Sequence, residues 1–325
     1  MKTFEKLTFP PGPLTSAYLA LNEVYVETRR HQEALAALKR TVLAGATSGR
    51  HKGLAIIGPT GSGKTATVKH AERWIRQELG LTAQCPTPLP IVLMTTRSTG
   101  KAVANSFLRA GRDPLAGTRT QDDAEAHIRE TSSDMEVVGF AVDEFHNVFS
   151  GKSESEALRM SLTIKTLVNS LAKPMIVMGI PGLEHQIDAN EELRQRFERK
   201  VYLEDPRVSS QDDVLEMRKV LQALNAVLPH EGDCDLGTKG MQIRLLYAAQ
   251  CRFGSVVDLV RSACEFGAME RQETVALKNY ASAYRDVAPQ AKREEKDNAF
   301  LMPLDIVHSL VKQMQDKQLR AGARS

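Results

Sequence analysis

The sequence lacks any long apolar run. No stretch approaches the roughly 18 uncharged apolar residues that a membrane-spanning helix needs, and residues 1–15 contain no apolar core of the kind found in a signal peptide. We therefore expect a cytoplasmic protein with no membrane partner. Internal repeats and low-complexity segments are missing as well, which argues against solenoid and disordered classes.

Cysteine is scarce in this chain. The four cysteines among 325 residues lie far apart and form no CxxC pair, so neither a zinc site nor a disulfide framework is expected. They are Cys85, Cys234, Cys251 and Cys264. We interpret them as reduced, mostly buried thiols.

A large excess of charge of one sign is also lacking. The formal net charge is +3, with 42% hydrophobic and 26% charged residues, a composition typical of globular proteins. Local patches, and not the sum, set the electrostatic potential that a polyanion meets. Nucleic-acid binding must therefore be argued from individual segments.

Short apolar runs alternate with helical sequence up to Pro206, and amphipathic helical patterns follow. The runs typical of buried parallel strands are Leu54–Ile57, Ile91–Met94, Val137–Val142 and Met175–Met178, with Lys200–Leu203 as a candidate fifth. Residues 14–44 predict one or two helices, closed by a loop over 45–52; the later helices are expected at 212–228, 238–252, 255–272, 275–287 and 304–319. The pattern predicts an α/β fold, a parallel sheet flanked by helices with a small C-terminal helical lid.

One glycine-rich segment fits the phosphate-binding pattern GxxxxGK[ST] in full. It reads Gly58, Pro59, Thr60, Gly61, Ser62, Gly63, Lys64 and Thr65, between an expected strand and an expected helix. Glycines let successive backbone N–H groups turn towards the phosphates, and the following helix presents its positive end to the same anion. We predict that Lys64 contacts the β- and γ-phosphates of ATP and that the Thr65 hydroxyl ligates Mg²⁺.

Two consecutive acidic residues follow the third expected strand. Asp143 and Glu144 would reach the sheet edge at which ligands bind in such folds. We predict that Asp143 holds Mg²⁺ through water and that Glu144 orients or deprotonates the attacking water. A solvated strand end is the alternative. The next polar residues, His146 and Asn147, either sense the γ-phosphate or satisfy a turn.

An arginine-rich segment precedes the fifth expected strand. An arginine inserted by a neighbouring subunit can stabilise the charge that phosphoryl transfer spreads over the γ-phosphate oxygens. Arg196 is the candidate, with Arg194 and Arg199 as alternatives, and such a residue acting in trans requires a homo-oligomer. A basic solvated turn or a DNA contact remains open for this segment.

These three elements, in this order and followed by a helical lid, resemble the AAA+ superfamily and its initiator and helicase-loader branch over residues 27–286. More narrowly, the Asp143–His146 segment, the Ile176–Pro181 strand end and the Arg196–Phe197 pair resemble TniB and TnsC, ATPase regulators of DNA transposition that include those of CRISPR-associated transposons. The resemblance implies an ATP-bound ring or filament on target DNA that connects a target-selection protein to the transposase.

Two features depart from the common AAA+ pattern. Many members end the fourth strand with a polar sensor residue, whereas Gly179 and Ile180 stand here. Many also carry an arginine after a glycine in the lid, and here only Arg252 or Arg261 could substitute. We therefore expect a slow, switch-like ATPase and not a motor.

Contacts to the DNA backbone are expected after the second strand, by resemblance to related transposition ATPases. Hydroxyls and cations suit phosphate contacts at a loop or helix start, and the candidates are Arg97, Thr99 and Lys101, with Lys152 as a further one. The partner would be double-stranded DNA bound without sequence preference. No aromatic stacking platform interleaves the basic residues, which argues against sequence-specific recognition of single strands. A solvated turn is the alternative.

The expected domains are an N-terminal arm with helices at 1–45, an AAA+ α/β core at 46–206, a helical lid at 207–288, and a linker with a helix at 289–325 that could dock a partner. Two other functions stay open. One is a helicase loader or replication initiator, and the other is a nucleotide-gated, DNA-bound scaffold with negligible turnover.

Overall fold

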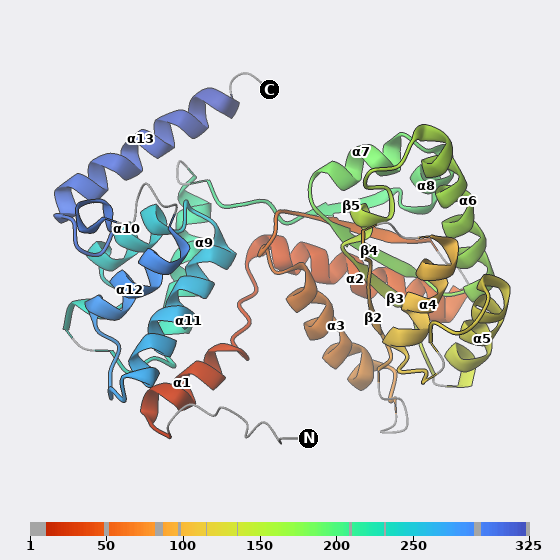
Figure 1. Ribbon diagram of the computed structural model, residues 1–325, viewed down its shortest axis with the longest axis horizontal. Helices are drawn as coiled ribbons and strands as arrows, with labels where there is room; N and C mark the ends of the chain where they lie inside the picture. Colours follow the sequence, from red (N-terminus) through yellow and green to blue (C-terminus); the bar gives the residue numbers. More distant parts are fainter. Residues whose placement is uncertain are drawn as a thin grey trace. The chain divides into compact units, whose positions relative to one another are not determined.

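The computed structural model describes residues 11–48, 52–81, 87–96, 99–114, 116–134, 136–207, 210–230, 232–288 and 294–322. The chain divides into two compact units (Figure 1). The core unit is Arg29–Glu204, and the lid unit combines Met1–Thr28 with Asp205–Ser325. Residues 1–45, expected to form one N-terminal region, are thus divided between the two units. α1 (Pro13–Leu21) belongs to the lid unit and α2 (Arg29–Ser48) to the core unit.

The core unit is built around a five-stranded sheet with the order β2-β3-β4-β1-β5. The strands are β1 (Leu54–Ile57), β2 (Ile91–Leu93), β3 (Phe140–Asp143), β4 (Met175–Gly179) and β5 (Arg199–Tyr202). Every pair is parallel, so the predicted α/β class is confirmed and all carboxyl ends meet at one edge. Since β1 lies between β4 and β5, the loop that follows β1 emerges between the carboxyl ends of these two strands.

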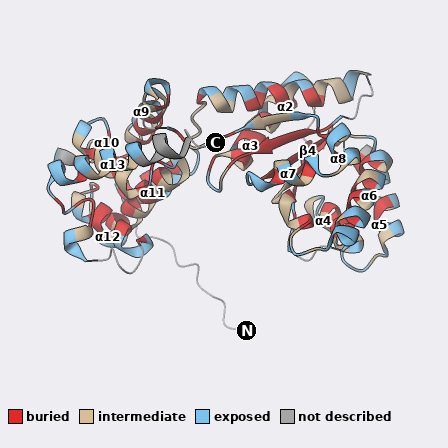
Figure 2. Cartoon of the chain, turned by 90° about the horizontal axis from the view of Figure 1, so that it is seen from above, coloured by how far each residue is buried: buried red, intermediate tan, exposed pale blue. Residues whose placement is uncertain are grey.

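Helices cover both faces of the sheet (Figure 2). Leu54 and Ile56 of β1 pack with α2 and α3 (Lys64–Glu78) on one face, whereas Ala55 and Ile57 pack on the other. The helices beyond that second face are α4 (Gly100–Ala110), α5 (Gln121–Asp134), α6 (Glu154–Leu171), α7 (Gly182–Asp188) and α8 (Glu191–Arg196), with the short η1 (Phe145–Val148) after β3. Strands apolar on both faces are what a fully covered parallel sheet requires.

The expected loop over residues 45–52 is wrong at its start, because α2 continues to Ser48. Gly45 lies inside this helix. A Cβ added there would lie 2.8 Å from both Cδ and Cγ of Pro174. The glycine therefore permits close packing against the segment before β4 and does not end the helix. Residues 49–51 of the expected loop lie outside the described residues.

The lid unit is helical around one apolar cluster. Its elements after β5 are α9 (Gln211–Asn225), η2 (Gly232–Cys234), α10 (Lys239–Ala248), α11 (Phe253–Met269), α12 (Leu277–Val287), η4 (Glu295–Asp297) and α13 (Leu304–Gly322). Leu14 and Leu21 of α1 complete the cluster, and a Cβ added at Gly267 of α11 would lie 2.6 Å from Leu14 Cδ1. α1 therefore packs closely against α11. Within the described part of the chain, no helix is long and apolar enough to cross a membrane.

Three cysteines confirm the prediction of free, buried thiols. Cys234, Cys251 and Cys264 are all buried in the lid unit and form no disulfide with one another. Burial raises the pKa of Cys251 to about 11, with a smaller effect of Asp205, and raises the pKa of Cys264 to about 12. The thiols of Cys251 and Cys264 are therefore protonated at neutral pH. Cys85 lies outside the described residues.

Candidate nucleotide-binding site

The glycine-rich loop joins β1 to α3, as its sequence predicts. Gly61 and Gly63 have φ values of 79° and 86°, a region that L side chains rarely adopt, so glycine is needed at both turns. Gly58 N donates a hydrogen bond to Gly179 O at 3.0 Å, which ties the start of the loop to the end of β4. The loop therefore lies at the carboxyl edge of the sheet, ahead of the N-terminus of α3.

Lys64 is buried at the first position of α3. Only 6% of its surface is exposed, and its Nζ donates to Gly58 O at 2.7 Å and Pro59 O at 2.8 Å. The Ser62 hydroxyl nearby is also buried and has no hydrogen-bond partner among the described residues. A buried ammonium, a hydroxyl and a helix N-terminus around one loop form a set of donors that fits a phosphate group.

The loop meets the acidic pair directly. Thr65 Oγ1 donates to Asp143 Oδ2 at 2.6 Å, and Glu144 N donates to Asp143 Oδ1 at 2.9 Å. Glu144 follows β3 with a φ of 54°, the left-handed region, which turns its carboxylate away from the strand direction. A hydroxyl and a carboxylate oxygen side by side are the hard ligands that Mg²⁺ prefers, so these residues fit the metal.

The two polar residues after Glu144 have different surroundings. Asn147 Nδ2 donates to Met94 O at 3.3 Å, which links η1 to the end of β2. His146 is largely buried, and its Nε2 lies 3.5 Å from Glu144 Oε2. Asn147 therefore joins two elements of the core unit, whereas His146 lies beside the acidic pair.

A residue that the sequence reasoning missed lies against the loop. His31 of α2 has its Nε2 3.0 Å from Ser62 O, and a Cβ added at Gly63 would lie 2.5 Å from the same nitrogen. His31 therefore supports the loop from the α2 side. Because 31 residues separate His31 from Ser62, no local pattern indicates this contact.

Arg196 lies at the other end of the strands. Its carbonyl accepts a hydrogen bond from Gly53 N at 2.9 Å, just before β1 begins, whereas the phosphate-binding loop follows the end of β1. Within the described residues its guanidinium forms no ion pair or hydrogen bond, whereas Arg194 pairs with Glu191 at 2.5 Å and Arg199 donates to Thr41 Oγ1 at 3.2 Å. Arg196 also lines an open hollow of about 790 Å³ with Lys52, Lys165, Glu192 and Glu198.

A family model described as the bacterial TniB protein matches residues 17–205. This match spans more than half of the chain, including the loop, the acidic pair and Arg196. The chain belongs to the TniB family. Among curated proteins, none matches the sequence significantly.

Several solved structures share the fold of this TniB family member. The Aeropyrum pernix ORC1 protein in complex with DNA is 17% identical, with a TM-score of 0.59 over 83% of this chain and 68% of that one. The A. pernix ORC2 protein in its ADPNP-ADP complexes is 15% identical, with a TM-score of 0.57 over 85% and 73%. Domain III of the Thermotoga maritima replication initiation protein DnaA is 16% identical, with a TM-score of 0.51 over 82% and 95%. The chain thus shares its fold with these ORC and DnaA proteins, in agreement with the predicted AAA+ type of α/β fold.

The candidate DNA contacts of this TniB family member follow two neighbouring strands. Thr99 caps α4 by accepting a hydrogen bond from Ala102 N at 3.2 Å, and Lys101 is exposed in the first turn of that helix. Lys152 precedes α6 and is half-buried. These residues follow β2 and β3, whose carboxyl ends lie at the edge that carries the loop. Arg97 lies outside the described residues.

The two arginines considered for the lid differ in their contacts. Arg261 Nη2 donates to Leu21 O at 3.1 Å, so it holds α1 on α11. Arg252 precedes α11, and its Nε lies 3.8 Å from Asp205 Oδ2. Arg261 is thus engaged inside the lid unit, whereas Arg252 is more exposed.

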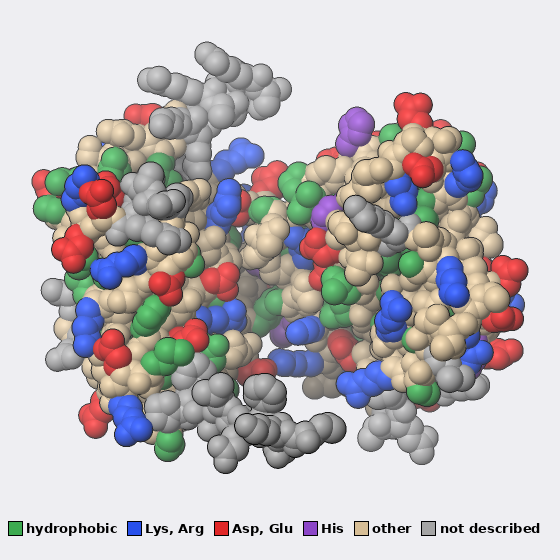
Figure 3. Space-filling view, in the orientation of Figure 1, with side chains coloured by type: hydrophobic (Ala, Val, Ile, Leu, Met, Phe, Trp, Pro, Cys, Tyr) green, Lys and Arg blue, Asp and Glu red, His purple; other side chains and the backbone are tan. Residues whose placement is uncertain are grey.

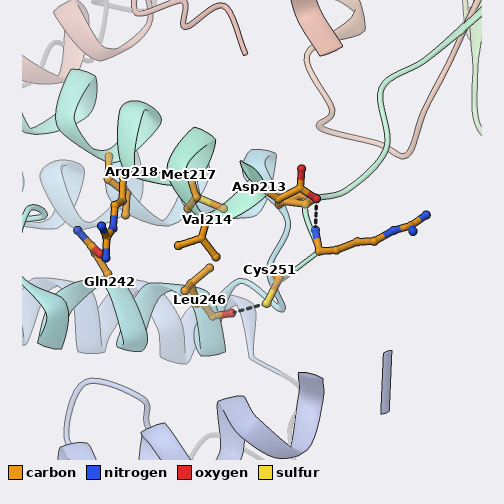
Figure 4. Close-up of a pocket in the computed structure, with 10 residues that line it drawn as sticks. Asp213, Val214, Met217, Arg218, Gln242, Leu246 and Cys251 are labelled. Carbon is orange, nitrogen blue, oxygen red and sulfur yellow. Dashed lines mark hydrogen bonds between the residues drawn. The ribbon is translucent and has the colours of Figure 1, made fainter. Parts of the chain in front are cut away.

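A pocket within the lid unit lies between α9 and α10 (Figure 4). It is lined mainly by apolar side chains such as Val214, Met217 and Leu246. Its volume of about 20 Å³ is room for roughly one water molecule. This pocket therefore cannot hold a nucleotide.

Proposed function

We propose that this protein is an ATP-dependent, DNA-binding AAA+ regulator of transposition. The hydrogen bond between Thr65 and Asp143 carries the proposal, because it joins the phosphate-binding loop to the acidic pair within a TniB family chain. ATP favours a homo-oligomer on double-stranded DNA, and this oligomer links a target-selection protein to the transposase. Hydrolysis disassembles it. ATP can drive assembly only by binding the assembled state more tightly.

Each residue of the site has one task in the proposed hydrolysis. Lys64, with the amides of the loop, binds the β- and γ-phosphates. Thr65 and Asp143 hold Mg²⁺, which when bound neutralises charge on the phosphate oxygens. Glu144 accepts a proton from the attacking water or orients it, and its partial exposure of 38% leaves the carboxylate reachable by water.

Arg196 is proposed to complete the site of a neighbouring subunit. Its position before β1 and β5, at the amino ends of the strands, separates it from the loop of its own chain. Its guanidinium is held by no described partner, whereas those of Arg194 and Arg199 are engaged. These contacts favour Arg196 over the other two as the arginine that acts in trans.

DNA binding is proposed through phosphate contacts of Arg97, Thr99, Lys101 and Lys152. On the face that Figure 3 shows, acidic and basic side chains are interspersed over each unit, which agrees with the net charge of +3. The contact must therefore be local. Among the structural relatives, the ORC1 protein is described in complex with DNA. Backbone contacts release counterions, so affinity should fall steeply with salt.

Two other functions have one observation each in their favour. The similarity to ORC1 and to DnaA favours a helicase loader or replication initiator. The lack of a polar side chain at Gly179 favours a DNA-bound scaffold that binds ATP with negligible turnover. Pull-down against a replicative helicase or a transposase separates the first from our proposal, and Glu144→Gln separates the second.

The decisive experiment follows assembly of the purified full chain on duplex DNA by electron microscopy and by a binding assay. We expect ATP to produce DNA-bound oligomers that ADP does not, and Glu144→Gln to prolong their lifetime because hydrolysis is blocked. Binding should weaken strongly between low and high salt. DNA binding that ignores both nucleotide and salt would contradict the proposal, and an unchanged lifetime in Glu144→Gln would favour the scaffold.

A further inference from the structure

The imidazole of His146 lies between the Glu144 carboxylate and the end of β4. Its Nε2 lies 3.5 Å from Glu144 Oε2, and only 13% of its side chain is exposed. The other ring nitrogen, Nδ1, is buried and has no hydrogen-bond partner among the described residues. The imidazole therefore presents one nitrogen to Glu144 and the other to the protein interior.

The Glu144 carboxylate has one side-chain contact among the described residues, the imidazole of His146. Within the described part of the chain, no other side chain forms a hydrogen bond or ion pair with it. With 38% of its side chain exposed, Glu144 is not restricted to one rotamer by packing. A contact from a fixed ring selects among its rotamers.

The ring fits because the last residue of β4 is glycine. A Cβ added at Gly179 would lie 3.2 Å from His146 Nδ1 and 2.8 Å from Leu183 Cδ2. Gly179 does not have a positive φ, so its backbone conformation is open to any residue. The need for glycine is therefore one of space, and the space is taken by His146 and Leu183.

The same contacts place the imidazole beside the phosphate-binding loop. Gly179 pairs with Ile57, the last residue of β1, and its carbonyl accepts the N–H of Gly58 at 3.0 Å. Many AAA+ proteins have a polar side chain at this end of β4. In this chain the polar side chain near the end of β4 is that of His146, which belongs to η1, the segment directly after the acidic pair.

The backbone that carries His146 is held on two sides. Phe145 is fully buried, with its ring centroid 5.9 Å from that of Phe197, and Val148 is fully buried as well. Asn147 adds its hydrogen bond to Met94 O. The position of the ring is thus set by packing before any nucleotide binds, as a preorganised site requires.

We propose that His146 is the positioning residue for Glu144 and that Gly179 provides the space it needs. The inference rests on the proposed ATP hydrolysis and names a residue that the reaction needs beyond the acidic pair. Nε2 holds the carboxylate so that it faces the attacking water. His146 touches neither phosphate nor water in this role and acts through Glu144 alone.

Amide substitutions at His146 provide the first test. The amide nitrogen of His146→Gln reaches approximately the position of Nε2, whereas that of His146→Asn lies near Nδ1. We expect His146→Ala and His146→Asn to lower kcat by roughly 10- to 100-fold, and His146→Gln to stay within about threefold of the parent. ATP affinity should change by no more than about twofold. Equal loss in the Gln and Asn variants, or a loss of affinity at constant kcat, would overturn the inference.

Substitution of Gly179 tests whether the imidazole needs the space at this glycine, while His146 itself stays unchanged. The Cβ of Gly179→Ala should shift the ring by a few tenths of an ångström and lower kcat by about 3- to 10-fold. Gly182→Ala on α7 is the matched control, because a Cβ there has no atom within 4 Å. If both alanine variants hydrolyse ATP at the parent rate, Gly179 has no part in positioning His146.

A measurement without nucleotide separates this inference from the proposed function. We would record the imidazole ¹⁵N resonances of the parent and identify those of His146 by their loss in His146→Gln. Glu144→Gln should shift the His146 Nε2 resonance, whereas Glu154→Gln, at the exposed first position of α6, should not. A parent that hydrolyses no ATP would refute the proposed function alone. An unshifted His146 signal in Glu144→Gln would refute the positioning role even in an active enzyme.

Discussion

The core unit and the lid unit both bury continuous apolar clusters, but they place their polar groups differently. In the core unit, Lys64, Ser62, Thr65, Asp143 and His146 gather at one edge of the sheet. In the lid unit, the buried ionisable groups include Cys251, Cys264 and Tyr280, spread over three segments. A parallel sheet brings the loops after its strands to one edge, whereas a helical cluster has no such edge.

The two lid thiols and the Tyr280 hydroxyl are also shifted towards their neutral forms. Burial raises the pKa of Cys251 and Cys264 to about 11 and 12, and burial raises the pKa of Tyr280 further still, with Cys234 and Cys264 adding to the shift. All three are therefore neutral at physiological pH. We therefore expect the chemistry to belong to the core unit and the lid unit to contribute structure, and four predictions test this division.

The largest expected effect is the loss of nucleotide binding in Lys64→Ala, because both hydrolysis and ATP-dependent DNA binding need bound nucleotide. Removal of a buried ammonium from the loop should lower ATP affinity at least about 100-fold and abolish ATP-dependent DNA binding. A fluorescent ATP analogue and a DNA-binding assay measure the two effects. Lys69→Ala, exposed on the same helix, is the control. Normal ATP-dependent DNA binding by Lys64→Ala would remove the core unit from the centre of the function.

Arg196→Ala should retain ATP binding and lose hydrolysis by about 10³-fold. Steady-state phosphate release measures this effect, with Arg194→Ala and Arg199→Ala as controls. Arg261→Ala, which loses the contact to Leu21 O, should affect stability and not turnover.

Mixed oligomers show whether Arg196 acts in trans. A subunit with Arg196→Ala keeps an intact site, and a Glu144→Gln neighbour can supply the arginine, so mixing the two inactive proteins should restore part of the hydrolysis. No recovery of hydrolysis on mixing would argue against an arginine supplied by the neighbouring subunit. Normal hydrolysis by Arg196→Ala alone would show that the role assigned to Arg196 is wrong.

A smaller effect is expected for Gly267→Ala in the lid unit. The added Cβ would lie 2.6 Å from Leu14 Cδ1 and should destabilise the packing of α1 on α11 by about 1–3 kcal/mol. Trp74, the single tryptophan, lies on α3 of the core unit, so its fluorescence reports on that unit, whereas circular dichroism reports on both. We expect the dichroism transition to move and the Trp74 transition to stay.

Gly12→Ala, where a Cβ has no atom within 4 Å, is the matched control in the lid unit. Equal shifts of both probes in Gly267→Ala would show that the two units unfold together. The proposed separation of a structural lid from a chemical core would then fail at the level of stability.

The smallest effect is a pH dependence of the lid unit. Folding raises the pKa of Cys264 from 9.0 to about 12, so the thiol ionises at lower pH in the unfolded chain than in the folded one. Its contribution to the free energy of unfolding is therefore complete below pH 9 and is lost as the pH rises towards 12. By pH 10 the loss should be about 1 kcal/mol. Urea unfolding at pH 8 and pH 10 measures this loss of unfolding free energy. In Cys264→Ala, the free energy of unfolding should fall less steeply with pH. An identical slope in that variant would contradict the assignment.

Much of the core unit could be predicted from the sequence because its signals are contiguous. The five strands, the glycine-rich loop and the acidic pair each depend on neighbouring residues, and the structure places β1 at the predicted Leu54–Ile57. The class, a covered parallel sheet with a helical lid, follows from the same patterns. The assignment of Lys64, Asp143 and Glu144 to their chemistry likewise came from motif and spacing alone.

Only the tertiary structure decided what depends on residues far apart in the chain. The sequence predicts a helix end at Gly45, although this glycine permits contact with Pro174, and α1 packs in the lid unit whereas α2 packs in the core unit. The strand order, the support of the loop by His31 and the space for His146 at Gly179 have no local signature either. Sequence patterns fix conformation where the cause is local, whereas packing assigns partners between distant segments, and the proposed positioning of Glu144 depends on packing.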